Sequence, residues 1–235
     1  MSIRAEHLNH IYGEGTAFEQ YALKDVSFEI EDGQFIGLIG HTGSGKSTLL
    51  NIISGDLDFD SGDRAVSSTA RIGFLRQNSG LDRSSTLIAE MRSVFAPLLE
   101  TERRMELLRI QMRQSPDNAA LLEEYNRLHT AFEAGDGYLI DVKINTILNG
   151  MGFAGRDRET LISTLSGGEK TRLALCKLLL EEPELLILDE PTNHLDFRTL
   201  IWLEDYLKGY KGALLIVSHD RFFLDSLVTS VCEID

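Results

Sequence analysis

The segment 40–48 has the residue types and spacing of a phosphate-binding loop. It reads GHTGSGKST and fits the pattern G-x-x-x-x-G-K-S/T, in which backbone N–H groups wrap phosphates. Lys46 is expected to reach the β- and γ-phosphates of a nucleotide, and Ser47 to ligate Mg²⁺. The whole loop is therefore predicted to bind nucleotide: Gly40, His41, Thr42, Gly43, Ser44, Gly45, Lys46, Ser47 and Thr48.

A second glycine-rich segment, 165–169, reads LSGGE. Its residues Ser166, Gly167 and Gly168 form a turn that opens a helix, and a helix N-terminus is a second place where an anion can bind. An ordinary nucleotide-binding domain needs only one such loop. Two of them indicate that a nucleotide is held from both sides.

Two carboxylates follow the apolar run 185–188, which is too hydrophobic to lie anywhere but the centre of a sheet. Open α/β sheets place ligands at the carboxyl ends of their strands, where Asp189 and Glu190 stand. We expect Asp189 to hold the metal through water, and Glu190 to act as general base for a water that attacks the γ-phosphate. The alternative is that both residues merely cap a strand.

Three further side chains are weaker candidates. His219 follows the apolar run 213–217, where it can contact the γ-phosphate or be an ordinary structural histidine. Gln77 follows the apolar run 71–75, where its amide can reach the metal and the attacking water. Tyr12 precedes a glycine-rich turn and can stack on adenine, or it can be a surface aromatic residue.

The elements that must position these residues read as a mixed α/β fold. Short runs rich in Ile, Leu and Val predict buried strands of a mainly parallel sheet with crossover helices. Those runs are 34–40, 71–75, 184–189 and 213–217. Residues 3–9 and 22–31 are different, since 22–30 alternates apolar and polar residues like a half-exposed antiparallel strand. A small β sub-domain is therefore expected beside the phosphate loop.

Residues 84–150 form a second unit, a helical sub-domain. Amphipathic stretches at about 98–114 and 117–134 predict a helical hairpin, with Ser115 as N-cap and Pro116 in the first helical position of the second helix. The mixed charges of the hairpin are typical of a solvated helix face. We therefore expect one domain, 1–235, whose core comprises 1–83 and 151–235.

Composition narrows the class of protein. The net charge of −14 disfavours strong binding to bare nucleic acid. The sequence contains no run of 18 or more apolar residues, so no membrane span is expected. The N-terminus has no apolar segment of signal-peptide type, which predicts a cytoplasmic location. Cys176 and Cys232 lie in apolar stretches and are expected to be buried, reduced thiols.

Taken together, these motifs resemble the ATP-binding cassette (ABC) superfamily of P-loop NTPases. In the family's order, the matching segments are Walker A at 40–48, the Q-loop glutamine Gln77, the signature at 165–169, Walker B at 185–190, the D-loop at 193–196 and the switch histidine His219. In that family two cassettes pack head to tail around two ATP molecules. The resemblance implies that Ser166, Gly167 and Gly168 touch the γ-phosphate of the partner's ATP. It also implies that Asp196 helps couple the two sites.

The two ends of the chain resemble different relatives. Residues 1 to about 50 resemble the ATPase subunits of energy-coupling-factor vitamin transporters. From about residue 62 onward the chain looks like the ABC-F proteins, which are ribosome-associated, normally carry two cassettes joined by a long linker, and have a helical insert between Gln77 and the signature. A mosaic joined within roughly 49–62, such as an engineered chimera, is therefore expected.

The predicted function is binding of Mg-ATP and its hydrolysis to ADP and phosphate by a head-to-tail homodimer. Three alternatives stay open. One is the energising subunit of a membrane importer, with transporter subunits as partners. Another is a translation factor whose partner is the ribosome. The last is a chimeric scaffold without a cellular role.

Overall fold

In a computed structural model, the chain folds into two compact units. The first comprises Met1–Gly80 and Gly167–Asp235, and the second comprises Leu81–Ser166, within which the expected helical segment 84–150 lies. The residues that the structure describes are 3–13, 15, 17–67, 70–75, 80–193 and 195–234.

An antiparallel sheet lies in the N-terminal part of the first unit, as predicted. Its described strands are β1 (Ile3–Tyr12), β2 (Gln20–Ile30) and β4 (Ser61–Val66), in the order β2-β1-β4. Ile3 pairs with Ile30 on one side and with Val66 on the other. The register between β1 and β2 shifts at three places between Ala5 and Ile11, so this sheet is strongly irregular at its centre.

A parallel sheet forms the centre of the first unit. Its strands among the described residues are β3 (Phe35–Ile39), β5 (Ile72–Phe74), β6 (Leu185–Asp189), β7 (Ala213–Val217) and β8 (Ser230–Glu233), in the order β5-β6-β7-β3-β8. The four strands expected from apolar runs are confirmed. The sequence did not predict β8, because it lies at the edge of the sheet and half of its residues are exposed.

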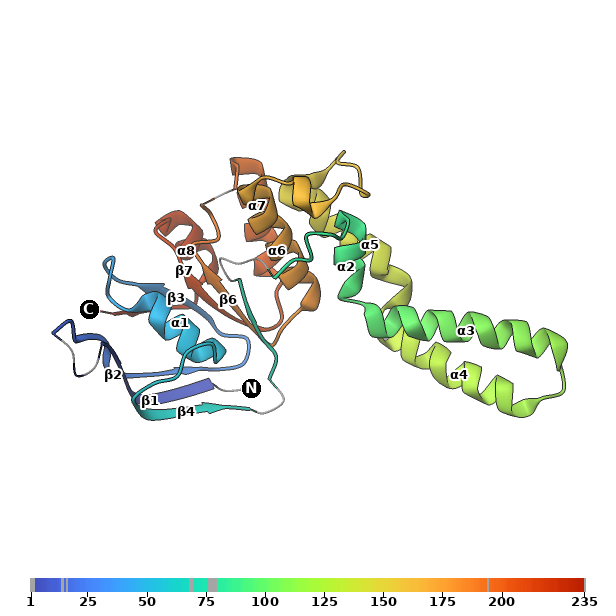
Figure 1. Ribbon diagram of the computed structural model, residues 1–235, viewed down its shortest axis with the longest axis horizontal. Helices are drawn as coiled ribbons and strands as arrows, with labels where there is room; N and C mark the ends of the chain where they lie inside the picture. Colours follow the sequence, from blue (N-terminus) through green and yellow to red (C-terminus); the bar gives the residue numbers. More distant parts are fainter. Residues whose placement is uncertain are drawn as a thin grey trace. The chain divides into compact units, whose positions relative to one another are not determined.

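Four helices in the described part of the first unit connect these strands. They are α1 (Lys46–Ser54), α6 (Gly167–Glu181), α7 (Phe197–Lys208) and α8 (Arg221–Leu227). Helix α1 lies between the two sheets (Figure 1), where Leu50 and Ile53 join one hydrophobic core with Leu8 of β1 and Ile187 of β6. Burial of α1 on both sides fixes the helix that the phosphate loop opens.

The second unit is helical. Its elements are α2 (Leu87–Ser93), α3 (Ala96–Gln114), α4 (Ala119–Ala134), the short turn η1 (Gly137–Leu139), α5 (Ile140–Leu148), the π-helical turn η2 (Asn149–Phe153) and η3 (Ile162–Thr164). The predicted hairpin is confirmed, with α3 and α4 side by side (Figure 1). Arg104 of α3 pairs with Glu124 of α4 at 2.8 Å.

The predicted start of the second hairpin helix was wrong. Ser115 is the C-cap of α3, and Asn118 is the N-cap of α4, where its side-chain oxygen accepts a hydrogen bond from the backbone N–H of Ala120. Pro116 stands in the connecting turn, closed by a hydrogen bond from the N–H of Asn118 to the carbonyl of Ser115. Both Ser and Asn cap helices well, so the residue type alone did not decide between them.

The two thiols agree in part with expectation. Cys176 on α6 is buried, whereas Cys232 is only half-buried because it lies on the edge strand β8; both are free thiols. No helix within the described part of the chain combines the length and the apolar character needed to cross a membrane.

Candidate nucleotide site

The phosphate loop connects β3 to α1, and glycine is needed where it passes other backbone. A Cβ atom added at Gly40 would overlap the carbonyl oxygen of Ile234, and one added at Gly45 would overlap the carbonyl oxygen of Ala22. Gly45 also has a φ of 90°, in the left-handed region that favours glycine. The loop is therefore held closely between β2 and the end of β8.

Lys46 is held by its own loop. Its ammonium donates hydrogen bonds to the carbonyl oxygens of Gly40 at 2.7 Å and His41 at 2.8 Å, and lies 3.5 Å from the hydroxyl of the buried Ser44. A lysine ammonium has three N–H donors and no acceptor. A phosphate oxygen can thus bind Lys46 only in exchange for one of these loop contacts.

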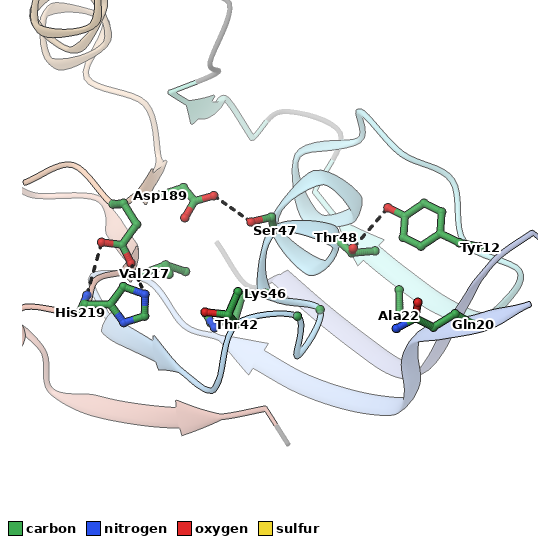
Figure 2. Close-up of a pocket in the computed structure, with 13 residues that line it drawn as sticks. Tyr12, Gln20, Ala22, Thr42, Lys46, Ser47, Thr48, Asp189, Val217 and His219 are labelled. Carbon is green, nitrogen blue, oxygen red and sulfur yellow. Dashed lines mark hydrogen bonds and ion pairs between the residues drawn. The ribbon is translucent and has the colours of Figure 1, made fainter. Parts of the chain in front are cut away.

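Ser47 and Asp189 bring two oxygen ligands together across the site. The Ser47 hydroxyl donates to the Oδ2 atom of Asp189 at 3.1 Å (Figure 2). Mg²⁺ prefers oxygen ligands, keeps several waters, and is normally bound by one or two protein groups plus substrate phosphates. Within the described residues no group of three or more His, Cys, Asp or Glu side chains could hold a metal. The pair therefore fits a magnesium ion shared with a nucleotide, not an all-protein metal cage.

Glu190 is the most constrained residue of the site. Its φ of 49° is unusual for a residue with a side chain, and its N–H donates to the carbonyl of Val217 at 2.8 Å. The Oε1 atom is buried without a hydrogen-bond partner among the described residues, and the side chain is only 21% exposed. A buried carboxylate oxygen without a donor costs free energy, and such strain is common at functional sites.

His219 is a polar neighbour of this carboxylate. Its Nε2 atom lies 3.4 Å from Glu190 Oε1, and its backbone N–H donates to Oε2 at 3.4 Å. The imidazole itself is 72% exposed. The histidine is thus much more exposed than the carboxylate beside it.

One cavity of about 390 Å³ unites most of the predicted residues (Figure 2). It is lined by Tyr12, Gln20, Ala22, Thr42, Gly43, Gly45, Lys46, Ser47, Thr48, Asp189, Glu190, Val217 and His219. Three of these residues were not predicted, namely Gln20, Ala22 and Val217, because no motif marks them. Gly40 and His41 instead line a neighbouring cavity of about 540 Å³, which shares Lys46 and His219 with the first.

Tyr12 lies at one end of the cavity and is half exposed. Its hydroxyl is 3.3 Å from the Oγ1 atom of Thr48, so the ring is attached to the helix that the phosphate loop opens (Figure 2). An exposed aromatic face beside a phosphate loop suits the predicted stacking on a nucleotide base.

The model of the ABC transporter family matches residues 23–193 of this sequence. The chain belongs to this family. It is thus an ABC ATPase domain by membership, and the matched residues include the phosphate loop and the strand that ends at Asp189.

Curated relatives match the chain over nearly all of its length. It is 41% identical to YdiF of Bacillus subtilis (strain 168), covering 100% of this chain and 36% of YdiF. It is 38% identical to the tylosin resistance ATP-binding protein TlrC of Streptomyces fradiae, over 92% of this chain and 40% of TlrC. It is 34% identical to the energy-dependent translational throttle protein EttA of Mycobacterium tuberculosis (strain ATCC 25618 / H37Rv), over 92% and 38%. The chain thus spans about two fifths of the length of these relatives.

Solved structures support the same fold. A dimeric ATP-binding cassette bound to ADP and Pi in a post-hydrolysis state has a TM-score of 0.65 and 20% identity, covering 99% of this chain and 96% of that chain. The end-to-end match to YdiF also means that a single relative accounts for both parts of the sequence. A mosaic origin stays a prediction.

The remaining ABC motifs lie elsewhere. Gly167 and Gly168 open α6, and neither is among the described residues that line the nucleotide cavity; Ser166 is the exposed last residue of the second unit. Asp196 is the N-cap of α7 and accepts a hydrogen bond from the N–H of Thr199 at 2.9 Å, which lowers the pKa of its carboxyl. Gln77 lies outside the described residues, as does position 194 of the D-loop.

Proposed function

We propose that this domain binds Mg-ATP and hydrolyses it to ADP and phosphate as one half of a head-to-tail dimer. The observation that carries the proposal is the Oε1 atom of Glu190, a residue that lines the phosphate-loop cavity: this carboxylate oxygen is buried and has no hydrogen-bond partner among the described residues. A donor is what an attacking water would supply.

Binding begins with the triphosphate on the loop between β3 and α1. The backbone N–H groups of the loop surround the phosphates, and Lys46 exchanges its bonds to Gly40 and His41 for bonds to phosphate oxygens. Tyr12 takes the base at the other end of the cavity. Bound magnesium, held by Ser47 and Asp189, would neutralise charge on the phosphates.

Hydrolysis then depends on Glu190. The carboxylate accepts the proton of a water that attacks the γ-phosphate, and the fixed backbone of Glu190 holds it in place. His219 lies 3.4 Å from the same carboxylate and is positioned to contact the transferred phosphate. Gln77, by resemblance, completes the set as a ligand of the metal and water.

The second wall of each site comes from another copy. The glycines of the signature are exposed or half-exposed at the start of α6 and do not line their own unit's cavity within the described residues. The N-terminus of a helix binds anions, so Ser166, Gly167 and Gly168 of one copy are suited to the γ-phosphate held by another. Asp196 would couple the two sites through the start of α7.

A rate measurement at several protein concentrations tests this arrangement. Composite sites require two copies, so the ATPase rate per milligram should rise with protein concentration until the dimer is saturated. Lys46→Ala, which removes the ammonium from the loop, should abolish ATP binding by calorimetry at any concentration. A specific rate that stays constant on dilution to concentrations at which the chain is monomeric by size-exclusion chromatography would exclude the dimer, and unchanged ATP affinity in Lys46→Ala would exclude the site.

A role at the ribosome is a second candidate, and it would be the biological setting of the same ATPase. It is favoured by the α3–α4 hairpin in the second unit and by relatives such as EttA, which is named as a translational throttle. ATP-dependent co-sedimentation with ribosomes, strongest when hydrolysis is blocked, would support it. Co-purification with membrane subunits would favour the importer instead.

A further inference from the structure

We propose that His10 is a positioning residue for nucleotide binding, which holds the Tyr12 ring at the base end of the cavity. This inference rests on the proposed function, since it concerns the base of the nucleotide that the cavity takes. Nothing in the sequence motifs marks His10.

The packing of His10 is that of an internal residue. Its side chain is only 11% exposed, and both ring nitrogens are buried without a hydrogen-bond partner among the described residues. The nearest charge is Asp60, whose Oδ2 atom lies 3.5 Å from Nδ1. Burying an imidazole without hydrogen bonds costs free energy, so the packing contacts of the ring must offset that cost.

The ring contacts Tyr12. The two ring centroids are 4.7 Å apart and the planes meet at 88°, which is the edge-to-face arrangement that aromatic pairs prefer. His10 and Tyr12 are two residues apart on β1, and a register shift lies between them at His10/Ile11, so the regular alternation of a strand does not by itself bring the rings together. The Tyr12 hydroxyl is at the same time 3.3 Å from Thr48. The phenol is thus fixed at its tip by α1 and along its side by His10.

The strand that carries both rings is anchored at this point. Asp60 accepts a hydrogen bond from the N–H of Ile11 at 2.6 Å, and its own N–H donates to the carbonyl of Asn9 at 2.9 Å. Register shifts lie on either side of His10, so the ladder to β2 does not by itself determine where the two rings point. Contact between the rings supplies the missing constraint.

Two substitutions separate this role from a general effect on folding. His10→Ala removes the ring, and we expect the Kd for ATP to rise about three- to tenfold, since an aromatic pair contributes about 0.5–1.5 kcal/mol. His10→Phe keeps an aromatic edge against Tyr12 and should restore the affinity. Inorganic tripolyphosphate, which has no base, should bind both variants as tightly as the unaltered chain.

His7→Ala is the matched control. His7 lies on the same strand, but its side chain is 78% exposed and hydrogen-bonded to Asp25, so its removal should leave the ATP affinity unchanged. An equal loss of ATP and tripolyphosphate affinity in His10→Ala, or failure of His10→Phe to restore ATP binding, would overturn the proposal. Loss of all binding in Lys46→Ala with no effect of His10→Ala would reject the role of His10 while leaving the nucleotide site intact.

Discussion

The two ends of the parallel sheet satisfy their polar groups very differently. At the carboxyl end, the Oε1 atom of Glu190 is buried without a hydrogen-bond partner among the described residues, and Lys46 bonds to its own loop, namely to the carbonyls of Gly40 and His41 and the hydroxyl of Ser44. At the amino end, Arg71 is bound from several sides, by the carboxylate of Glu184 and by the carbonyls of Glu181 and Glu182. The carboxyl end thus has polar groups that suit the proposed ligand, whereas the polar groups of the amino end bond to one another and stabilise the fold.

The tyrosines at the amino end strengthen this contrast. Tyr210 donates a hydrogen bond to the carbonyl of Pro183, and Tyr206 donates to the carbonyl of Leu179 at 3.3 Å. Burial raises the pKa of Tyr206 to about 12, so this donor keeps its proton at any physiological pH. Substitutions at the two ends should therefore separate activity from stability.

The largest effect is expected for Glu190→Gln at the carboxyl end. The amide has the shape of the carboxylate but cannot accept the proton from water, so kcat should fall about 10²–10⁴-fold. ATP affinity should be retained. Thermal unfolding should be unchanged or shifted to higher temperature, because a buried, incompletely paired charge is removed. Near-normal turnover would show that Glu190 is not the general base.

Arg71→Ala tests the opposite end. It removes the side-chain hydrogen bonds to Glu184 and to the carbonyls of Glu181 and Glu182, and should lower the free energy of unfolding by about 1–2 kcal/mol. The kcat for ATP should not change, because Arg71 lies at the other end of the strands. Chemical denaturation measures the loss, with Arg71→Lys as the partial restoration. A fall in kcat without a fall in the free energy of unfolding would contradict the view that the amino ends of the strands serve stability and the carboxyl ends serve activity.

Tyr210→Phe should have a smaller effect of the same kind. Loss of the hydroxyl leaves the carbonyl of Pro183 without this donor, which costs about 1 kcal/mol and lowers the melting temperature by about 2–4 °C. Differential scanning calorimetry measures the shift. An unchanged melting temperature would mean that water replaces the hydroxyl at no cost.

The smallest effect concerns acid stability. The backbone N–H of Arg71 bonds the carboxylate of Glu184 at 2.7 Å and is the main reason that the pKa of Glu184 is lowered from 4.5. A carboxyl whose folded pKa is depressed stabilises the fold fully above its unfolded pKa, and the contribution is lost as pH falls through the folded value. Urea unfolding between pH 6 and about pH 3 should therefore show a shallower decline for Glu184→Gln than for the unaltered chain.

Much of the first unit was predictable because single segments determine it. Every residue of β7 is buried, and its run of Ala, Leu, Ile and Val can only be a central strand. By contrast β4 reads SGDRAV and contains no such signal; it is a strand because it pairs with β1. A segment that owes its structure to a distant partner cannot be recognised from its own residues.

The same division applies to the site. Lys46, Ser47, Asp189 and Glu190 were predicted because their motifs fix both residue type and neighbourhood in the chain. The contact between His10 and Tyr12 depends on irregular strand pairing, and the bonds of Lys46 to its own loop depend on its conformation. Motifs predict which side chains are candidates for ligand binding. The residues that orient those side chains can be identified only from the folded structure.

The close passage of Gly40 and Gly45 has an evolutionary consequence. Both glycines face main-chain carbonyl oxygens, those of Ile234 just after β8 and of Ala22 in β2, and not the side chains of these two residues. Exchange of either neighbour for another residue leaves the carbonyl where it is. A single-residue insertion or deletion in β2 or before Ile234 would displace that carbonyl and the loop resting on it. We therefore expect related domains to vary in residue type at the positions of Ala22 and Ile234. The lengths of β2, which contains Ala22, and of β8, which precedes Ile234, should be conserved.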